Sequence, residues 1–346
     1  MAVKNEKGDK DMNRRMFDVG ARVAMIGDSI THSGLAVAYL QEYYLTHFPE
    51  RRVKIYNLGT GGDSAAGACA EERLREILAV EPTEAVVMFG VNDMNVPAYA
   101  SITPTPAEVE KRTAARRRHL EATVRLVGML RERGLSVTLC SSVGRDEHTA
   151  GEGGYLSHGA TAALLGMYHD DLAAIGEGVL KNTVDYLTPM QTLQAELSAI
   201  GGPSLFAPDR THPSDLGQVM MARIFLAAQG LPVSLPSAAV LAEGWRERTL
   251  PKPLAERRRA GLRWRDLSWV YPHQADRTPG MTKEARIAFW REEAKRTDLP
   301  PYFINMYRNY VENAENEDAY LADYLARTDA LYATDVDENV KEDLRI

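Results

Sequence analysis

The sequence has few cysteines, no excess of basic residues and no long uninterrupted apolar run. Its 346 residues include only Cys69 and Cys140, too few for a disulfide framework or an all-cysteine zinc site. Lys and Arg number 41 against 48 Asp and Glu, and this net charge of −7 argues against a nucleic-acid or membrane-surface binder. With 45% hydrophobic residues, the composition is that of a globular protein.

Residues 1–19 form a polar, strongly charged leader without the apolar stretch that a secretory signal needs. No apolar run in the sequence is long enough to cross a bilayer. The two cysteines are compatible with a reducing compartment. We therefore expect a cytoplasmic protein without a membrane partner.

Short apolar runs alternate with segments of helical periodicity between residues 20 and 230. The patterns predict strands at 22–26, 53–58, 85–89, 136–140 and 184–187, and helices at 35–44, 65–78, 108–133, 160–176 and after Pro213. This βαβα alternation is typical of an α/β fold with a five-stranded parallel sheet and helices on both faces. In such sheets ligands bind outside the carboxyl ends of the strands.

The pattern changes near Gly230, where we place a domain boundary. Prolines punctuate short helical segments after this point, and residues 302–332 space aromatic and leucine side chains at helical intervals. The extension, residues 231–346, is therefore expected to be mostly helical. All four tryptophans lie in it, namely Trp245, Trp264, Trp269 and Trp290. Its basic half and acidic half are expected to fold against each other or against a neighbouring subunit, which leaves packing, a lid, a sugar-stacking platform or homo-oligomerisation as possible roles.

Two polar groups far apart in the sequence could form a nucleophilic site. Ser29 follows the first predicted strand, and a serine hydroxyl attacks at neutral pH only when a positioned base removes its proton. The segment Asp209-Arg210-Thr211-His212 supplies a histidine three positions after a carboxylate. Taken separately, Ser29 is equally well explained as a helix cap, and His212 as a residue at a helix entry.

Acyl transfer also needs hydrogen-bond donors for the developing oxyanion. Gly62 could offer an unobstructed backbone amide, and Asn92 a side-chain carboxamide, each after a predicted strand. Glycine and Asn-Asp pairs are also ordinary turn formers. The complete set is therefore more informative than any one member.

The motifs Gly27-Asp28-Ser29-Ile30, Gly62, Gly90-x-Asn92-Asp93 and Asp209-x-x-His212, in this order, resemble those of the SGNH (GDSL-type) hydrolase family. The resemblance covers about residues 20–230. It implies a flavodoxin-like three-layer αβα sandwich and ester hydrolysis without a metal or organic cofactor. It also implies Ser29, His212 and Asp209 as the catalytic triad, with Ser29, Gly62 and Asn92 as the oxyanion hole. The usual leucine after the serine is replaced by Ile30.

We expect a serine esterase acting on small or carbohydrate-linked acyl esters, with acetyl or another short acyl group. Further candidates for substrate binding are Asp28 and Asp93, beside the motif residues, and His148 and His158 in a glycine-rich loop. A thioesterase or lysophospholipase is the alternative within the family. A catalytically silent binding or scaffold module is the alternative from another class.

Two other kinds of site are less well supported by the sequence. A dinucleotide-binding fingerprint begins at Gly59-x-Gly61 but has Ser64 where the third glycine or alanine is required. The histidines, His119 among them, form no H-E-x-x-H or H-x-H grouping, so we expect no metal site and interpret them as scattered surface or core residues.

Overall fold

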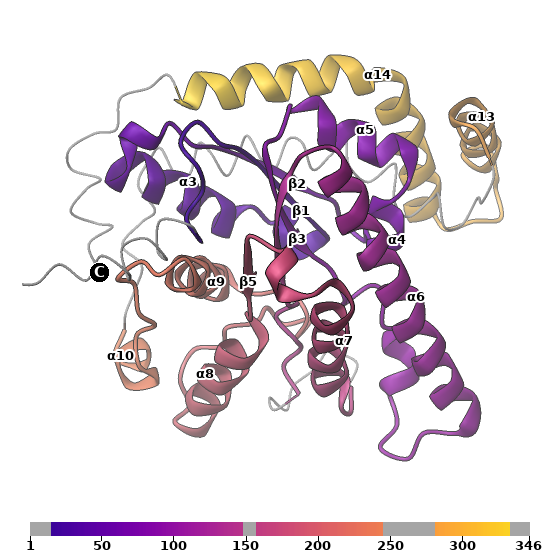
Figure 1. Ribbon diagram of the computed structural model, residues 1–346. Coiled ribbons are helices and arrows are strands. Elements are labelled where there is room, and N and C mark those ends of the chain that lie inside the picture. The colour runs from indigo at the N-terminus through magenta and orange to yellow at the C-terminus, as the bar shows by residue number, and fades with distance from the viewer. Residues whose placement is uncertain (1–14, 148–156, 245–280, 333–346) are drawn as a thin grey trace, which may run out of the picture.

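The structure, a computed structural model, describes residues 15–147, 157–244 and 281–332 (Figure 1). These residues contain a five-stranded parallel sheet in the order β2-β1-β3-β4-β5. Its strands are β1 (Arg22–Gly27), β2 (Lys54–Gly59), β3 (Glu84–Met88), β4 (Ser136–Cys140) and β5 (Asn182–Val184). The parallel α/β sheet predicted from the sequence is confirmed. Because the chain moves from β1 to β2 on one side and then to β3 on the other, the strand order reverses beside β1, where open sheets of this kind bind ligands.

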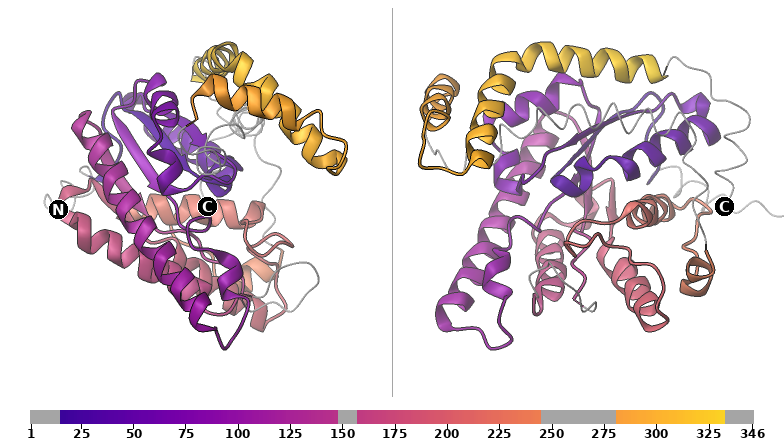
Figure 2. Two further views of the ribbon diagram at one scale, coloured as in Figure 1. Left: turned by 90° about the vertical axis from the view of Figure 1, so that its right-hand side faces the viewer. Right: turned by 180° about the vertical axis from the view of Figure 1, so that it is seen from behind.

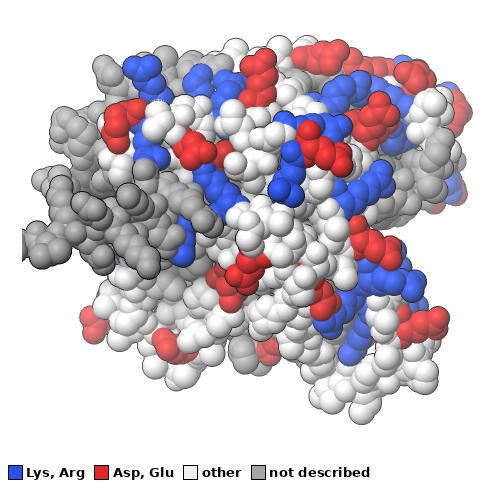
Figure 3. Space-filling model, in the orientation of Figure 1, with Lys and Arg blue, Asp and Glu red and all other residues white. Residues whose placement is uncertain are grey.

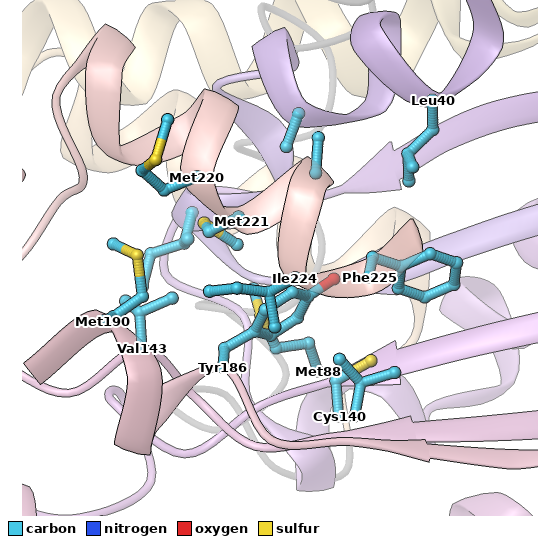
Figure 4. Packing of buried hydrophobic residues seen from close by; sticks show 14 of the residues in the cluster. Leu40, Met88, Cys140, Val143, Tyr186, Met190, Met220, Met221, Ile224 and Phe225 are labelled. Atoms are coloured by element: carbon cyan, nitrogen blue, oxygen red, sulfur yellow. The ribbon is translucent and has the colours of Figure 1, made fainter. Parts of the chain in front are cut away.

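Helices cover both faces of the sheet, as the alternation along the strands requires. Val23 and Met25 belong to one core cluster, whereas Ala24 and Ile26 belong to the other. The first cluster lies under α3, α8 and α9, and the second under α5 and α6 (Figures 1 and 2). Figure 4 shows Met190 of α8 and Met220, Met221, Ile224 and Phe225 of α9 in the same cluster as Met88 and Cys140 at the strand ends. The result is a three-layer sandwich.

The helices around the sheet are α2 (Ser29–His32), α3 (Leu35–His47), α4 (Ala65–Ala68), α5 (Glu71–Ala79), α6 (Pro106–Glu132), α7 (Ala160–Ile175), α8 (Leu187–Ala199), α9 (Asp215–Ala228) and α10 (Ala238–Ala242). Short 3₁₀ segments are found at Pro49–Arg51, Val96–Tyr99 and Glu177–Val179. The C-terminal helices are α13 (Lys283–Glu293) and α14 (Pro301–Tyr332).

Two local predictions were wrong. The single helix predicted at 65–78 is two helices, because Ala70 takes an extended conformation between α4 and α5. The run predicted as a strand at 184–187 contributes only Val184 to β5. Leu187 already begins α8, where the Asp185 carboxylate accepts a hydrogen bond from the Thr188 amide. The helix predicted after Pro213 is α9, which is capped by Ser214 and begins at Asp215.

The C-terminal helices make specific contacts with the sheet domain and with each other. Arg286 of α13 forms an ion pair with Glu72 of α5, and Arg291 forms one with Glu315 of α14. Trp290 is buried against Tyr310 between the two helices. The chain directly after residue 230 belongs to the larger core cluster, to which it contributes Leu231, Ala238 and Leu241. Trp245, Trp264 and Trp269 lie outside the described residues.

The surface carries charges of both signs in close alternation. Figure 3 shows acidic and basic side chains interspersed over the face that it presents. The run Arg116-Arg117-Arg118 lies on α6, where Arg116 pairs with Asp170 of α7 and Arg117 lies 4.0 Å from Glu121. Within the described ranges, no helix has the length and hydropathy needed to cross a membrane.

The end of β2 touches the turn after β1 so closely that Gly59 has no room for a side chain. A Cβ atom there would lie 2.3 Å from the backbone nitrogen of His32. We expect Gly59→Ala to destabilise the protein by about 1–3 kcal/mol, because neighbouring backbone must move to admit the methyl group. Urea denaturation measures this change.

The matched control is Gly128→Ala in the middle of α6, where a Cβ would meet nothing within 4 Å. This substitution should stabilise the protein by about 0.5–1 kcal/mol through the helix preference of alanine. Equal stability of Gly59→Ala and the wild type would contradict the close approach.

Candidate active site

Ser29 lies at the first position of α2, directly beyond the carboxyl end of β1. The side chain of Asp28 caps this helix and accepts a hydrogen bond from the Ile30 amide at 2.9 Å. Burial raises the pKa of Asp28 to about 7, against the hydrogen bond from Ile30, which lowers it. Asp28, and not Ser29, is therefore the capping residue, which leaves the serine hydroxyl available for other contacts.

The structure brings Ser29, His212 and Asp209 together across 183 positions of sequence. The Nε2 atom of His212 lies 2.7 Å from the Oγ atom of Ser29. On the other side of the ring, Nδ1 lies 2.5 Å from Oδ2 of Asp209. An Nδ1–H tautomer donates to the carboxylate and leaves the Nε2 lone pair to accept the serine proton. The side chains form a continuous path from hydroxyl to imidazole to carboxylate.

Asp209 is held in its ionised form by the loop that contains it. Its Oδ1 atom accepts hydrogen bonds from the amides of Thr211 and His212, both at 3.0 Å. Partial burial raises the pKa of Asp209, but these bonds and the His212 side chain outweigh burial and hold it below its usual range. Arg210, between Asp209 and His212 in the loop, takes a left-handed conformation with φ of 58°. That turn folds the carboxylate back toward the imidazole.

The turn after β2 and the turn after β3 are joined by the side chain of Asn92. One N–H of its Nδ2 donates to the backbone oxygen of Asp63 at 2.8 Å, which leaves the second N–H for another acceptor. Gly62, with φ of 77°, has the left-handed conformation that glycine adopts without strain. Within the described residues, the amides of Gly62 and Ser29 donate to no protein acceptor. All three predicted oxyanion donors thus keep a free N–H at neighbouring strand ends.

A buried cluster of charged side chains holds the turn that contains Gly62. The Arg73 guanidinium, fully buried, bonds to the Asp63 carboxylate at 3.1 Å and to Glu76 at 2.6 Å, and also to the backbone oxygen of Leu58. Burial raises the pKa of Asp63 to about 7 despite the opposing charge of Arg73. The arginine therefore fixes both the end of β2 and the turn that follows it.

The residues predicted to bind substrate lie in different surroundings from the triad residues. Asp28 is buried and the side chain of Asp93 is only 5% exposed, and their carboxylates bond to the backbone of α2 and α4, which favours a structural role. His158 donates its backbone amide to the oxygen of Tyr99. His148 lies outside the described residues.

Sequence reasoning missed the polar residues behind the strand ends, namely Arg73, His119 and Asp171. His119 lies on the buried face of α6, in register with Ala115, Ala122 and Leu126, and that periodicity was the available signal. Across residues 15–147, 157–244 and 281–332, no group of three or more His, Cys, Asp and Glu side chains could hold a metal ion.

Similar solved structures include one with a TM-score above 0.5, which supports the fold. The chain is similar to BT4096, a gut microbial diltiazem-metabolizing enzyme, with 16% identity and a TM-score of 0.72, over 92% of this chain and 96% of that one. It is also similar to Axe2, an acetylxylan esterase from Geobacillus stearothermophilus, with 21% identity and a TM-score of 0.49, over 64% of this chain and 99% of the other. No curated protein matches the sequence.

The sequence itself matches a known family over residues 25–219, which is more than half of the chain. This range begins in β1 and ends in α9, and it contains every residue of the Ser29–His212–Asp209 arrangement. The protein therefore belongs to the GDSL-like lipase/acylhydrolase family and is an ester-hydrolysing enzyme of the SGNH fold.

Proposed function

We propose that the protein is a serine esterase in which Ser29 is the nucleophile, His212 the general base and Asp209 the residue that orients the base. The observation that carries this proposal is the short path from the Ser29 hydroxyl through both nitrogens of His212 to Asp209. A serine hydroxyl is a poor nucleophile at neutral pH, and a base within hydrogen-bonding reach activates it by taking its proton.

The first half of the reaction forms an acyl-enzyme. His212 Nε2 takes the hydroxyl proton while Ser29 Oγ attacks the ester carbonyl carbon. The carbonyl oxygen becomes an oxyanion and accepts hydrogen bonds from the amides of Ser29 and Gly62 and from Asn92. The intermediate collapses as His212 gives its proton to the departing alcohol, and the C–O bond to that alcohol breaks.

The second half uses the same groups on water. His212 removes a proton from a water molecule, whose oxygen attacks the acyl carbon. Collapse of the second intermediate breaks the bond to Ser29 Oγ, and the proton returns to the serine. The Asp209 carboxylate stabilises the imidazolium in each half without taking a proton itself.

We propose a small or carbohydrate-linked acyl ester as substrate, with acetyl or another short acyl group. The side chains of His212 and Asp209 are 41% and 49% exposed, which supports an open site rather than one enclosed for a long apolar chain. Thioesters and lysophospholipids are the alternatives within the family. A series of p-nitrophenyl esters from acetyl to palmitoyl separates a short-chain from a long-chain preference, and acyl thioesters of the same chain lengths test the thioesterase alternative. Inactivity on all of them would favour a silent binding module.

We propose that residues 20–230 form the catalytic unit and that the extension from residue 231 packs against it. The ion pair of Arg286 with Glu72 and the packing of Leu325 against the second core cluster support such a role. Analytical ultracentrifugation tests whether the same extension makes a subunit contact. A structure of a substrate-analogue complex tests whether it acts as a lid.

Ser29→Ala is expected to reduce kcat for p-nitrophenyl acetate by at least about 10³-fold, because the nucleophile is lost. The melting temperature should change little, since Asp28 and not Ser29 caps α2. Steady-state kinetics and thermal unfolding measure the two effects.

The matched control is Ser33→Ala at the end of the same turn, where the hydroxyl donates a hydrogen bond to the backbone oxygen of Ile30. This variant should keep near wild-type activity. Retained activity in Ser29→Ala, or a large loss of stability in place of activity, would rule out the nucleophile assignment.

Asn92→Ala is expected to lower kcat by about 10²–10³-fold with little change in KM, because an oxyanion donor acts mainly in the transition state. Asn95→Gly in the same loop is the control, since its left-handed conformation, with φ of 54°, suits glycine. A kcat for Asn92→Ala within a few-fold of the control would remove Asn92 from the oxyanion hole.

A further inference from the structure

A second Asp–His–Asp arrangement lies buried behind Asn92, separate from the triad. His119 of α6 has Nδ1 3.3 Å from Oδ1 of Asp93, which follows Asn92 in the chain, and Nε2 2.9 Å from Oδ2 of Asp171 on α7. All three side chains are no more than 5% exposed. Three titratable groups are thus enclosed next to the predicted oxyanion donors.

The two carboxylates favour a positively charged imidazole. Nε2 of His119 lies 2.9 Å from Oδ2 of Asp171 and 3.3 Å from Oγ1 of Thr123. Nδ1 pairs with Oδ1 of Asp93 at 3.3 Å as an ion pair and makes no hydrogen bond among the described residues. Burial lowers the pKa of His119, but the interactions with Asp171 and Asp93 outweigh burial and raise the pKa to about 10. The protonated form of His119 is therefore favoured at neutral pH.

Asp93 connects this cation to the turn that contains Gly62. Its Oδ1 atom also accepts a hydrogen bond from the Ala65 amide, the first residue of α4, at 3.1 Å. The preceding residue, Asn92, bonds to the Asp63 backbone oxygen. Asn92 and Asp93 therefore connect the turn after β3 to the turn after β2, and His119 pairs with Asp93.

The second carboxylate oxygen of Asp93, Oδ2, makes a neighbouring positive charge more important for the stability of this buried group. Oδ2 is buried and has no hydrogen-bond partner among the described residues. The negative charge of Asp93 also raises the pKa of both Asp28 and Asp63. A buried carboxylate in such surroundings keeps its position only when it is paired with a cation.

We propose that His119, as an imidazolium, is a positioning residue that holds Asn92 and the Gly62 turn in the geometry of the oxyanion hole by pairing with Asp93. This inference rests on the proposed function, because it assigns His119 a part in that reaction. His119 touches no reacting atom and acts through Asp93, while Asp171 keeps the ring charged and oriented.

The charged and titratable groups coupled to His119, Asp93 or Asp170 come from several elements. They are Arg116 on α6, Asp170 and Asp171 on α7, Asp93 after β3, Asp63 after β2, Asp28 after β1 and Cys69 after α4. Burial raises the pKa of Asp28 and Asp63 to about 7, so these two carboxyls also titrate in the neutral range. Each variant is therefore compared with the wild type at the same pH.

The decisive variant is Asp171→Asn, which keeps the size of the side chain and removes one of the two charges that hold the proton on His119. The pKa of His119 in this variant should fall from about 10 toward neutral. We expect kcat at pH 6 to remain within a few-fold of the wild type and to drop about 10-fold further than the wild type does as pH rises to 9. KM should change much less, since the oxyanion hole acts in the transition state.

The matched control is Asp170→Asn, the adjacent carboxylate on α7, which pairs with Arg116 at the surface. Its kcat profile should follow that of the wild type, although it loses an ion pair of the same kind. A merely structural effect of Asp171→Asn would lower kcat equally at all pH values, whereas a positioning effect lowers it only where His119 loses its proton.

A second measurement applies even where a variant is unstable. The imidazole carbon and nitrogen NMR signals of His119 in the wild type should remain those of an imidazolium up to about pH 9, and His119→Gln should lower kcat about 10–100-fold without a matching change in KM. A His119 signal that titrates near its ordinary pKa of about 6.5 would overturn the inference, as would identical pH profiles for Asp171→Asn and Asp170→Asn.

The failure of this inference differs from the failure of the proposed function. If the wild type hydrolyses p-nitrophenyl acetate and Ser29→Ala does not, while the His119 and Asp171 variants match the wild type at every pH, then only the role of His119 is wrong. If the wild type hydrolyses no ester, both proposals are wrong.

Discussion

The close side-by-side approach of the turns after β1, β2 and β3 is the constraint on which the site depends. These strands are neighbours in a parallel sheet, so their carboxyl ends meet at one edge, and the reversal of strand order beside β1 leaves that edge open. The absence of any Cβ at Gly59 allows α2 to lie against the end of β2. Backbone packing therefore brings the turns that carry Ser29, Gly62 and Asn92 to one edge of the sheet.

Paired charges then hold these turns in place. Arg73 anchors the turn after β2 through Asp63, and His119 anchors the turn after β3 through Asp93. Breaking a buried pair leaves an uncompensated charge, so a framework of this kind tolerates few substitutions but fixes geometry closely. On the far side of the site, the loop with Asp209 and His212 is more exposed and takes its shape from local hydrogen bonds.

The parts of the molecule that follow from local sequence could be predicted. Alternating apolar runs gave the parallel sheet, and the motif around Ser29 together with Asp209-x-x-His212 gave the residues that meet at its edge. Features that depend on tertiary contacts could not be predicted: the break between α4 and α5, the early start of α8 at Leu187, and the partners of His119. The Asp171 carboxylate is 52 positions from His119, and neither residue has a local pattern that indicates the other.

Labelling with an alkylphosphonofluoridate tests the central claim most directly, because the reagent forms a phosphorus–oxygen bond only with an activated serine and releases fluoride. The account predicts a single covalent adduct, mapped by peptide mass spectrometry to Ser29, and no adduct when His212 is replaced by Ala. Labelling at another serine, or at Ser29 with equal speed in the absence of the imidazole, would contradict it.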